Sequence, residues 1–451
     1  MKELTFESDR TTNPSYSQAD GYLDPLYVND YLFCTHLYDG SGGIKDGTYL
    51  VPFERELYYT KRKSLASYRN FLKPIINALV EPVFSNPITR TTTNPLYLGF
   101  IDDCDNRETS LSNIMAKAAT LMKLHGVTFV VMDNFNDPPG SQATVLADRK
   151  YPYIYIQPAY TVDSYEVDKF NKLISITFKG EDEVIDGKKY KILWRYDSVA
   201  ITKQYHTGSG KDSKLIREEP VEHGLNVMPV IPVYDNGLTD QVLPPPTFYD
   251  IAKLNWSLFN KDSELRDLER AQSFSVFYAQ LGGSNNNITI GPHAMMNLPA
   301  DPSITIPPGY ASPNPGISDQ LVKSCNEFVE SIYKAASQQG IVGIKQTSGI
   351  AEAYKFQSAN TQLKQTANIM QNLETKLVAM FGRYTKQTID CSISYTKQYD
   401  TYYSNINVDE IAKLLQLDIS DEIKKEIKKT VITRFLNHLD DDTMRKLQDI
   451  V

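Results

Sequence analysis

The residue types that could do chemistry in this sequence are scattered, and the short motifs that would organise them are incomplete. A phosphate-binding loop needs glycines followed by Gly-Lys-Ser/Thr, because its backbone amides must cradle the phosphates. Here Gly210-Lys211 is followed by Asp212, and Tyr205 stands where the first glycine belongs. A Gly-x-Ser-x-Gly nucleophile motif does not occur in the sequence. We therefore interpret the segment around Gly210 as a turn between strands.

A short acidic segment could suggest a calcium loop or paired catalytic carboxylates. A calcium loop of the EF-hand type needs oxygen ligands at alternate positions and then a glycine, but Arg107 and Glu108 occupy those later positions. We interpret the segment as a solvated loop before a helix that Ser110 caps. Carboxylates from distant positions can still pair in a folded enzyme, which keeps a hydrolase as an alternative. The acidic residues are Asp102, Asp103, Asp105 and Glu108.

Histidine and cysteine do not form a recognisable set of metal ligands. Only His36 lies near a cysteine, Cys34, and no second pair completes a four-ligand site. We interpret His125, next to Gly126, as a helix-end residue that the helix dipole favours. We expect no metal and no other cofactor. The other histidines are His206, His223, His293 and His438, and the other cysteines are Cys104, Cys325 and Cys391.

Composition indicates a protein of more than one packed region, because 451 residues are too many for one ordinary core. The formal net charge of -8 argues against tight, sequence-specific DNA binding, which usually needs a basic face. An acidic wall would still suit a passage through which DNA slides, because few counterions are released on contact. The widely spaced cysteines predict reduced thiols. No apolar run is long enough to span a membrane, so we expect no membrane partner.

Periodic apolar positions predict several amphipathic helices. Pro74 interrupts the first of them, so we expect a kink or a break there. The last has a stripe that runs from Leu363 through Met370 and Leu377 to Tyr384. The predicted helices cover residues 53–80, 110–125, 248–272, 318–337 and 350–388.

Over residues 151–234, runs of β-branched and aromatic residues between charged or Gly-containing turns predict a meandering antiparallel sheet, and the apolar run at 127–133 predicts a separate buried strand. Residues 1–50 suggest an extended arm with short helical pieces, 86–110 a turn-rich connection and 135–150 a loop. Together the helices and strands predict the α+β class. The predicted strands cover residues 127–133, 153–156, 174–178, 190–196, 200–205 and 230–234.

The order of the elements is more informative than any chemical motif. A strand-rich region is followed by a helix, a small insert rich in Gly, Asn and Pro, and a second helix of similar length. A Gly-flanked loop and a long helix complete the series. Two helices that flank a compact insert would make a stalk with a knob at its tip, and such stalks around an axis would form a tube. A lone subunit would then expose apolar helix faces, which drives cyclic association.

At this level the chain resembles the portal proteins of tailed bacteriophages, the subunits of a ring at one capsid vertex. The resemblance covers most of residues 50–390 and rests on the order and spacing of five passages. These are Glu54-Arg55 through Tyr58, Arg62, Tyr68, Arg69 and Asn70 to Val83-Phe84 and Pro87; Leu124-His-Gly126 to Asp133 with Tyr151-Pro-Tyr-Ile154; Gly224 to Val233; Asp250-Ile-Ala-Lys-Leu-Asn255 with Ser263 and Glu264; and Thr347-Ser-Gly-Ile-Ala-Glu-Ala353.

The resemblance implies a portal fold with a mixed α/β wing, a two-helix stem, a small loop-and-strand clip, a long wing helix and a short helical crown. It assigns residues 1–245 to the N-terminal arm and wing, 246–272 to the first stem helix, 273–317 to the clip, 318–338 to the second stem helix, 339–349 to a tunnel loop, 350–389 to the long wing helix and 390–451 to the crown.

The resemblance also implies partners and site residues. The chain is expected to form a twelve-subunit ring in the virion, assembled in the host cytoplasm, without enzymatic activity of its own. Expected partners are the major capsid protein, the large terminase subunit, a tail or adaptor protein, and double-stranded DNA bound without sequence specificity. Lys345, Gln346, Thr347 and Ser348 of the tunnel loop are expected near the DNA, and Asn285, Asn286, Asn287 and His293 of the clip at a docking surface.

Two other readings stay open at the level of sequence. A head–tail adaptor or a minor capsid protein would also assemble without catalysis, although adaptors are usually shorter. A hydrolase with scattered carboxylates would require a saturable small-molecule site or a tightly bound metal. For the loop at residues 339–349, a simple helix-to-helix turn is the plain alternative to a DNA contact.

Overall fold

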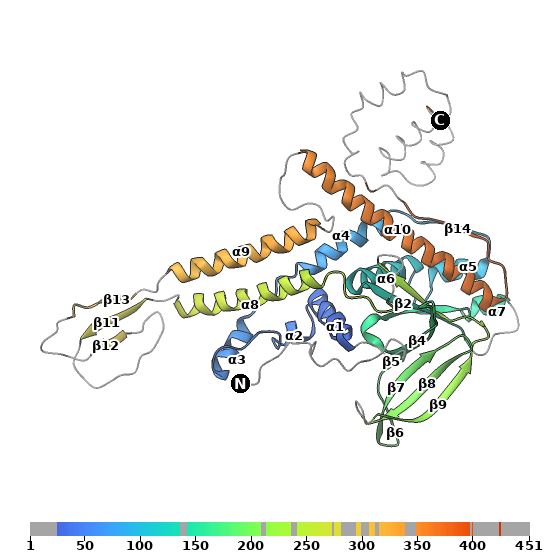
Figure 1. Cartoon of the computed structure of the whole chain (residues 1–451), viewed down its shortest axis with the longest axis horizontal. Coiled ribbons are helices and arrows are strands. Elements are labelled where there is room, and N and C mark those ends of the chain that lie inside the picture. The colour runs from blue at the N-terminus through green and yellow to red at the C-terminus, as the bar shows by residue number, and fades with distance from the viewer. Residues whose placement is uncertain are drawn as a thin grey trace. The chain divides into compact units, whose positions relative to one another are not determined.

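The structure is a computed structural model, and the chain divides into two units, Met1–Gln398 and Tyr399–Val451. The first unit combines helices with antiparallel sheets, which confirms the predicted α+β class (Figure 1). Most of the predicted crown, and the helices expected in it, falls outside the described residues. The structure describes residues 25–135, 142–208, 213–235, 241–272, 275–280, 295–298, 306–311, 315–338, 349–396, 399 and 424.

The extended arm predicted for residues 1–50 is wrong for its second half, although helical pieces are present as predicted, because residues 28–50 are packed against the rest of the unit. Helix α1 (Pro25–Asp39) buries Tyr31, Cys34 and Leu37 completely. The hydroxyl of Tyr31 donates a 2.5 Å hydrogen bond to the carbonyl of Pro244, far along the chain. The short helix α2 (Gly42–Lys45) follows. Local composition suggested an arm, but tertiary burial of one helical face determines the outcome.

The helical stretch predicted over residues 53–80 is broken, as expected, but before the proline rather than at it. Helix α3 (Glu56–Leu65) ends where Ala66 turns extended, and helix α4 (Leu72–Ser85) begins six residues later. Pro74 lies in the first turn of α4, where its missing N–H has no helical partner to lose. Helix α4 buries Ile75, Ile76 and Leu79.

Residues 86–110 are more regular than predicted. They contain strand β1 (Thr89–Thr92) and helix α5 (Pro95–Asp102), whose start is capped by the Asn94 side chain. Helix α6 (Leu111–His125) then follows as predicted. The hydroxyl of Ser110 accepts from the amide of Asn113 at its start, and Gly126 ends it with a φ of 80° in the left-handed region. That conformation suits glycine because no side chain is present to clash.

The meandering sheet predicted over residues 151–234 is in fact divided between two antiparallel sheets, because its strands separate into two groups of partners. The smaller sheet has the order β10-β2-β3, and the larger has the order β4-β5-β7-β8-β9 with β6 paired to β7. Phe129 of the smaller sheet contacts Phe178 of the larger at 5.5 Å between ring centroids, inside a shared apolar core. The strands are β2 (Val127–Asp133), β3 (Tyr153–Pro158), β4 (Val162–Val167), β5 (Leu173–Lys179), β6 (Glu183–Ile185), β7 (Lys188–Tyr196), β8 (Ala200–Thr207), β9 (Lys214–Glu222) and β10 (Val230–Tyr234).

Two further short elements lie between β2 and β4. The predicted loop at 135–150 contains helix α7 (Gln142–Ala147), and a single 3-10 turn covers Ala159–Thr161. Strands β4, β6 and β9 were not predicted. Strand β9 is exposed along nearly its whole length and contains Pro220, so it lacks the apolar alternation on which strand prediction depends.

Helix α10 (Gly349–Thr385) lies along α4, α6 and the smaller sheet, and the strand β14 (Cys391–Ser394) that follows it pairs with β1 (Figure 1). Its predicted apolar stripe is confirmed for Leu363, Ala367 and Met370, which are all buried. The hydroxyl of Tyr384 donates to the carbonyl of Met132 at 3.2 Å. The long helix is therefore fixed to the sheet core along its C-terminal half.

Between β10 and α10 in the sequence lies a helical hairpin with an inserted sheet. Helix α8 (Tyr249–Gln272) leads into strands β11 (Val276–Gln280), β12 (Met295–Leu298) and β13 (Gly309–Ala311), and the chain returns in helix α9 (Pro315–Gln338). Strand β11 pairs with β12 in parallel and with β13 antiparallel. Across the part of the chain that the structure describes, the helices fail to combine the length and apolarity that a membrane span requires.

Candidate functional site

The feature that stands out in the first unit is the pair of helices α8 and α9, each 24 residues long, which pack side by side (Figure 1). We call this pair the stem. The buried residues of α9 include Cys325, Ile332 and Ala336, whose spacing of seven and four places them on one helical face. Cys325 lies beside Asp262 of α8, and burial, followed by that carboxylate, raises the pKa of the Cys325 thiol to about 11. The thiol is therefore uncharged at neutral pH.

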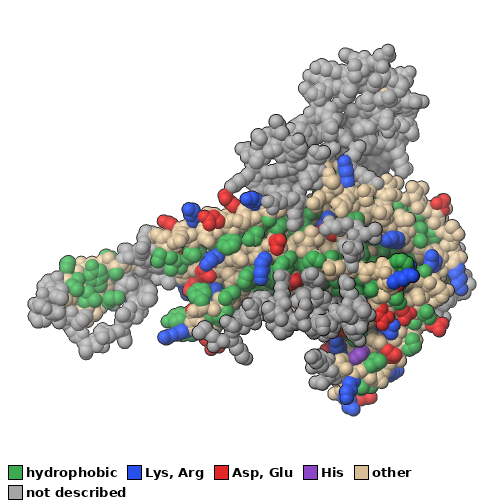
Figure 2. All heavy atoms as spheres, in the orientation of Figure 1, with side chains coloured by type: hydrophobic (Ala, Val, Ile, Leu, Met, Phe, Trp, Pro, Cys, Tyr) green, Lys and Arg blue, Asp and Glu red, His purple; other side chains and the backbone are tan. Residues whose placement is uncertain are grey.

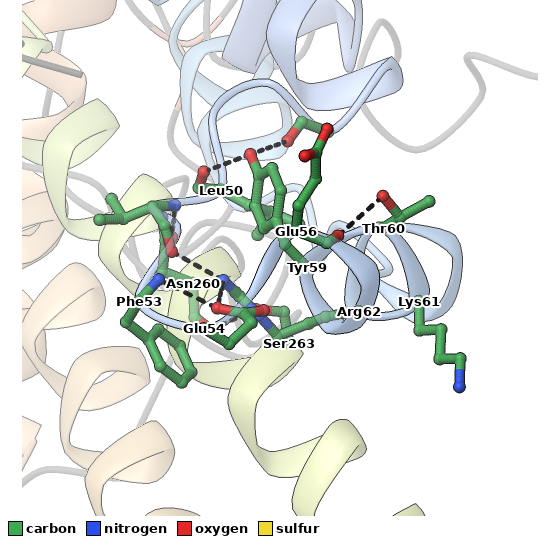
Figure 3. A network of polar contacts seen from close by, with 12 residues as sticks. Leu50, Phe53, Glu54, Glu56, Tyr59, Thr60, Lys61, Arg62, Asn260 and Ser263 are labelled. Carbon is green, nitrogen blue, oxygen red and sulfur yellow. Dashed lines mark hydrogen bonds and ion pairs between the residues drawn. The ribbon is translucent and has the colours of Figure 1, made fainter. Parts of the chain in front are cut away.

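A buried arginine ties the stem to the N-terminal segment. Arg62 of α3 is completely buried, and its Nε donates to Glu54 Oε1 at 2.6 Å while its Nη1 donates to Ser263 Oγ of α8 at 2.8 Å. Its Nη2 donates to the Val51 carbonyl at 2.7 Å. Figure 3 shows Glu54, from the loop before α3, and Ser263, from α8, next to Arg62 of α3. The buried charge is thus both paired and hydrogen-bonded, which a buried guanidinium requires.

Aromatic rings complete the surroundings of Arg62. Its guanidinium carbon lies 4.6 Å from the ring centroid of Phe53 and 5.6 Å from that of Tyr59, both within cation–π range. Partial burial disfavours the charged form of Glu54, but the hydrogen bonds from Arg62 and from the Phe53 amide outweigh it and lower the pKa of Glu54. Glu54 therefore stays ionised beside Arg62 at neutral pH.

A second polar anchor is the fully buried Asn255 of α8. Its Oδ1 accepts from the hydroxyl of Tyr68 and from the amide of Phe71, both at 2.9 Å, and from the amide of Leu72 at 3.3 Å. Its Nδ2 donates to the carbonyl of Arg69 at 2.8 Å. Asn255 therefore satisfies backbone groups in the break between α3 and α4, where no helical ladder could satisfy them.

Further contacts hold the same junction. Arg69 forms a bidentate ion pair with Asp262, in which Nε and Nη2 each lie 2.6 Å from a carboxylate oxygen. The indole Nε1 of Trp256 donates to the Tyr49 carbonyl at 2.8 Å, and Asn260 Oδ1 accepts from the Val51 amide at 2.8 Å. The base of the stem is thus joined to residues 49–72 by directional contacts rather than by apolar packing alone.

Two buried ion pairs fix the remainder of the unit. Glu374 of α10 is fully buried and receives Arg90 Nη2 at 2.5 Å and Nε at 2.9 Å, together with the hydroxyl of Tyr395. Lys123 of α6 pairs with Asp235 at 2.5 Å. Tyr395 lies shortly before the second unit begins, so the Glu374 cluster holds the end of the first unit in place.

His125 differs from its predicted role. It is the last residue of α6, but it is fully buried, and this burial lowers the pKa of its imidazole to about 3. Since the Thr35 hydroxyl donates to the Tyr31 carbonyl at 2.9 Å, it accepts from His125 Nε2 at 2.8 Å. The imidazole is neutral at physiological pH, so attraction of a cation to the helix dipole does not explain its position.

The alternative of a metal site concerns how the potential ligand side chains are arranged in the residues that the structure covers. Within them, three or more His, Cys, Asp or Glu side chains do not gather in a group that could hold a metal ion. The acidic segment begins at Asp102, the last residue of α5, and continues into a loop in which Asp105 accepts from the amides of Arg107 and Thr109. Asp103 pairs with Arg149, which sequence analysis did not anticipate.

The site residues predicted from the resemblance stay predictions. Lys345, Gln346, Thr347 and Ser348 lie outside the described residues, and so do Asn285, Asn286, Asn287 and His293. By contrast, two passages that carried the resemblance come together in space. The passage from Glu54 to Asn70 supplies Arg62, Tyr68 and Arg69, and the passage from Asp250 to Glu264 supplies Asn255 and Ser263, which they contact.

Comparisons with known proteins give a distant likeness in three-dimensional structure. No protein-family model matches the sequence, and a search of curated proteins gave no match either. Among solved structures, a chain from "Virion of native gene transfer agent (GTA) particle" is 9% identical with a TM-score of 0.42, covering 89% of this chain and 98% of that one. A chain from "Neck of empty GTA particle computed with C6 symmetry" is 10% identical with a TM-score of 0.44, covering 92% and 98%. With TM-scores below 0.5, these similarities assign neither a family nor a function.

Proposed function

We propose that this chain is a structural portal subunit: it forms a ring, of twelve copies, at one vertex of a tailed-phage-type capsid. The ring serves as the channel for packaging and ejection of double-stranded DNA. It also docks the large terminase subunit and a tail or adaptor protein, and it sits among copies of the major capsid protein. The chain itself is not an enzyme, and ATP hydrolysis belongs to the terminase. Its location is the virion, after assembly in the host cytoplasm.

The observation that carries the proposal is the stem with its inserted sheet. Two helices of equal length run alongside each other, and the chain passes through the three-stranded sheet between them. A small sheet of three short strands has little apolar surface of its own to bury, which suits a surface that partners complete. The stem supplies a straight, repeated unit that can pack around an axis.

The polar anchors support the same proposal. A subunit that holds a channel open must keep its stem at a fixed angle to the rest of the chain. Arg62 and Asn255 do this through hydrogen bonds with defined directions, which specify orientation more strictly than apolar contacts. In this proposal residues 1–245 and 350–389 build the wing, 273–317 the clip, 339–349 the tunnel loop and 390–451 the crown.

The test is the oligomeric state of the full purified chain. Native mass spectrometry should give closed oligomers of about a dozen subunits, and negative-stain images should show rings with a central hole. Because portal-type chains can stay monomeric without a scaffold, the same imaging should be repeated on capsid extracts. A monomer or dimer in both preparations would contradict the proposal, and rings found only at a tail terminus would favour a head–tail adaptor. A saturable small-molecule site would favour the hydrolase.

A further inference from the structure

The exposed side of helix α10 carries charge of one sign. Its side chains are described over residues 359–385, where the charged residues are Lys364, Glu374, Lys376 and Arg383. The three basic residues are exposed, whereas Glu374 is fully buried in its pair with Arg90. This part of α10 therefore presents only positive charges to solvent, in a chain whose formal net charge is -8.

The basic residues lie along one side of the helix. Positions 364, 368, 372, 376, 379 and 383 recur at spacings of three or four, which places them on a common face. The opposite face, with Leu363, Met370 and Leu377, is buried against the rest of the unit. We call the exposed side the basic face of α10, and its residues are Lys364, Asn368, Asn372, Lys376, Ala379 and Arg383.

The stem helices show how charge is arranged on other exposed helices of this chain. Helix α8 exposes Glu269 beside Arg266 and Arg270, and the exposed positions of α9 also combine acidic residues with lysines. Such mixing of signs is what solubility alone favours. The basic face of α10 departs from this arrangement, so contact with solvent does not account for it.

The cations of the basic face are available to a ligand and stand on a fixed support. Across the part of the chain that the structure describes, Lys364, Lys376 and Arg383 take part in no ion pair. The helix beneath them is held by the buried pair of Glu374 and by Tyr384, which donates to the smaller sheet. An anionic partner would therefore have to order only the ends of these side chains on binding.

The neutral residues of the basic face indicate a nucleic acid. Asn368 and Asn372 offer amide donors between the cations, and Ala379 is the one apolar residue of the face. Protein partners depend on large aromatic and aliphatic side chains at the centre of an interface, whereas contacts to DNA phosphates come from Lys, Arg, Asn and other polar side chains. In Figure 2 hydrophobic side chains gather along the stem and on the inserted sheet, while the region of α10 shows mainly uncharged polar groups with basic side chains among them.

The length of the basic face also fits a duplex. Arg383 lies 19 residues after Lys364, which is about 28 Å along a helix. One turn of B-form DNA is about 34 Å long and carries about one negative charge per 1.7 Å of its axis. Each cation of the face can therefore reach a phosphate whatever the base sequence.

We propose that the basic face of α10 binds the phosphate backbone of double-stranded DNA without sequence specificity. Lys364, Lys376 and Arg383 supply the charge, and Asn368 and Asn372 supply further hydrogen-bond donors. This inference rests on the proposed function, which gives the chain a duplex to handle, and it names a contact separate from the loop at residues 339–349. With three cations the binding is weak in one chain and is strengthened when several copies meet the same duplex.

The test is binding of the full chain to a fluorescently labelled duplex of about 30 base pairs, followed by anisotropy between about 50 and 200 mM salt. The variant Lys364→Gln/Lys376→Gln/Arg383→Gln should bind at least about tenfold more weakly at the lower salt, and the slope of log K against log salt should become shallower by about 2 to 3. The charge-conserving variant Lys364→Arg/Lys376→Arg/Arg383→Lys should stay within about threefold of the wild type. All chains are compared in the same oligomeric state.

The matched control is Lys179→Gln/Lys188→Gln/Lys214→Gln, which removes the same charge from exposed lysines of the larger sheet. It should keep the wild-type salt slope, and an equal loss in both triple variants would overturn the basic face as a site. No measurable binding by the wild type would overturn it too. Poly-glutamate that releases the duplex as well as unlabelled DNA of equal charge does would favour an acidic polypeptide partner and would also contradict the proposal.

Ring imaging separates this inference from the proposed function. Rings should persist in the α10 triple variant, and their loss would assign the face to a contact between subunits instead of to DNA. If rings persist while the triple variant binds the duplex as the wild type does, the basic face is overturned and the portal function stands. If the wild type forms no rings, purified or in capsid extracts, the portal function fails, and the duplex measurements still decide the basic face.

Discussion

The hydroxyl of Ser263 accepts a 2.8 Å hydrogen bond from Nη1 of Arg62, across a separation of 201 residues in the chain. This contact joins helix α3, in the N-terminal segment, to α8, the first helix of the stem. Arg62 has no exposure to solvent, so its charge depends wholly on the partners that the fold supplies. The stability of the stem base should therefore respond sharply to changes at this position.

Arg62→Met should destabilise the chain by about 3 to 5 kcal/mol, because it removes one half of a buried ion pair. It leaves the Glu54 carboxylate without its cation and the Val51 carbonyl and the Ser263 hydroxyl without a donor. Urea denaturation at neutral pH measures the loss. The neighbouring exposed residue serves as control: Lys61→Met should change the free energy of unfolding by less than about 0.5 kcal/mol. Equal effects at both positions would contradict this account.

Asn255→Leu should cost about 3 kcal/mol or more, because the amides of Phe71 and Leu72 and the carbonyl of Arg69 lose a buried partner at once. Asn255→Asp keeps the oxygen that accepts from Tyr68 and Phe71 but places a second acceptor against the Arg69 carbonyl. It should therefore also destabilise, although by less at low pH, where the carboxyl can donate. Thermal unfolding of both variants, with Ser257→Ala on the same helix as control, measures these differences.

Glu374→Gln should destabilise the first unit by about 3 kcal/mol, since Arg90 would keep its charge in a largely buried place without an anion. Tyr395→Phe removes one hydrogen bond to the same carboxylate and should cost about 1 kcal/mol. Limited proteolysis should cut both variants faster than the wild type in the segment after Ser394. Unchanged cleavage in the Gln variant would show that the cluster does not hold this segment.

The buried His125 predicts a loss of stability in mild acid. Its pKa is about 3 in the folded chain against an ordinary value of 6.5, so the unfolded chain binds a proton that the folded chain does not. Its contribution is complete above pH 6.5 and falls by about 1.4 kcal/mol per pH unit as the pH drops from there toward 3. His125→Gln can still donate to Thr35 and should flatten this decline. Denaturation curves between pH 7.5 and 4.5 compare the two; parallel declines would contradict the assignment.

On the proposed function, Lys345→Ala should leave ring assembly intact and mildly alter the packaging or retention of DNA. The reason is that a single lysine can contact phosphates as a point charge without contributing to subunit contacts. Ring counts by negative-stain imaging and the DNA content of filled particles are the measurements. Lys323→Ala on the stem is the comparison. Loss of rings in Lys345→Ala would show that the assignment of the tunnel loop is wrong.

The sequence was most informative where local chemistry decides the structure. Helix α6 begins and ends at residues whose side chains or backbone geometry set those boundaries, Ser110 and Gly126, and β2 follows in a continuous apolar run. It was least informative where burial comes from distant partners. The extent of helix α1 could not be predicted because polar residues surround it in the sequence. Strand β9 could not be predicted because it is exposed and contains Pro220.

The polar contacts that anchor the stem could not be predicted from periodicity, and their residues stood out only as part of the resemblance. Arg62 and Ser263, or Tyr68 and Asn255, have no periodic signal that links them, because their separation of about 190 to 200 residues reflects the fold alone. All four residues lie in two of the passages on which the resemblance rests. The structure supplies the reason, which is that each passage satisfies the buried polar groups of the other.

Gly126 has a mechanical consequence for the stem. A Cβ atom at this position would lie 3.0 Å from the carbonyl oxygen of Pro245, a few residues before α8 begins. A helix of 24 residues is about 36 Å long, so a rotation of about 5° at its base would move its far end by about 3 Å. Because Gly126 has no side chain, the backbone at Pro245 can approach it closely, and this close approach helps to set the direction of the stem. In the proposed ring, an error in the direction of the stem would be repeated in every copy and would widen or narrow the central channel.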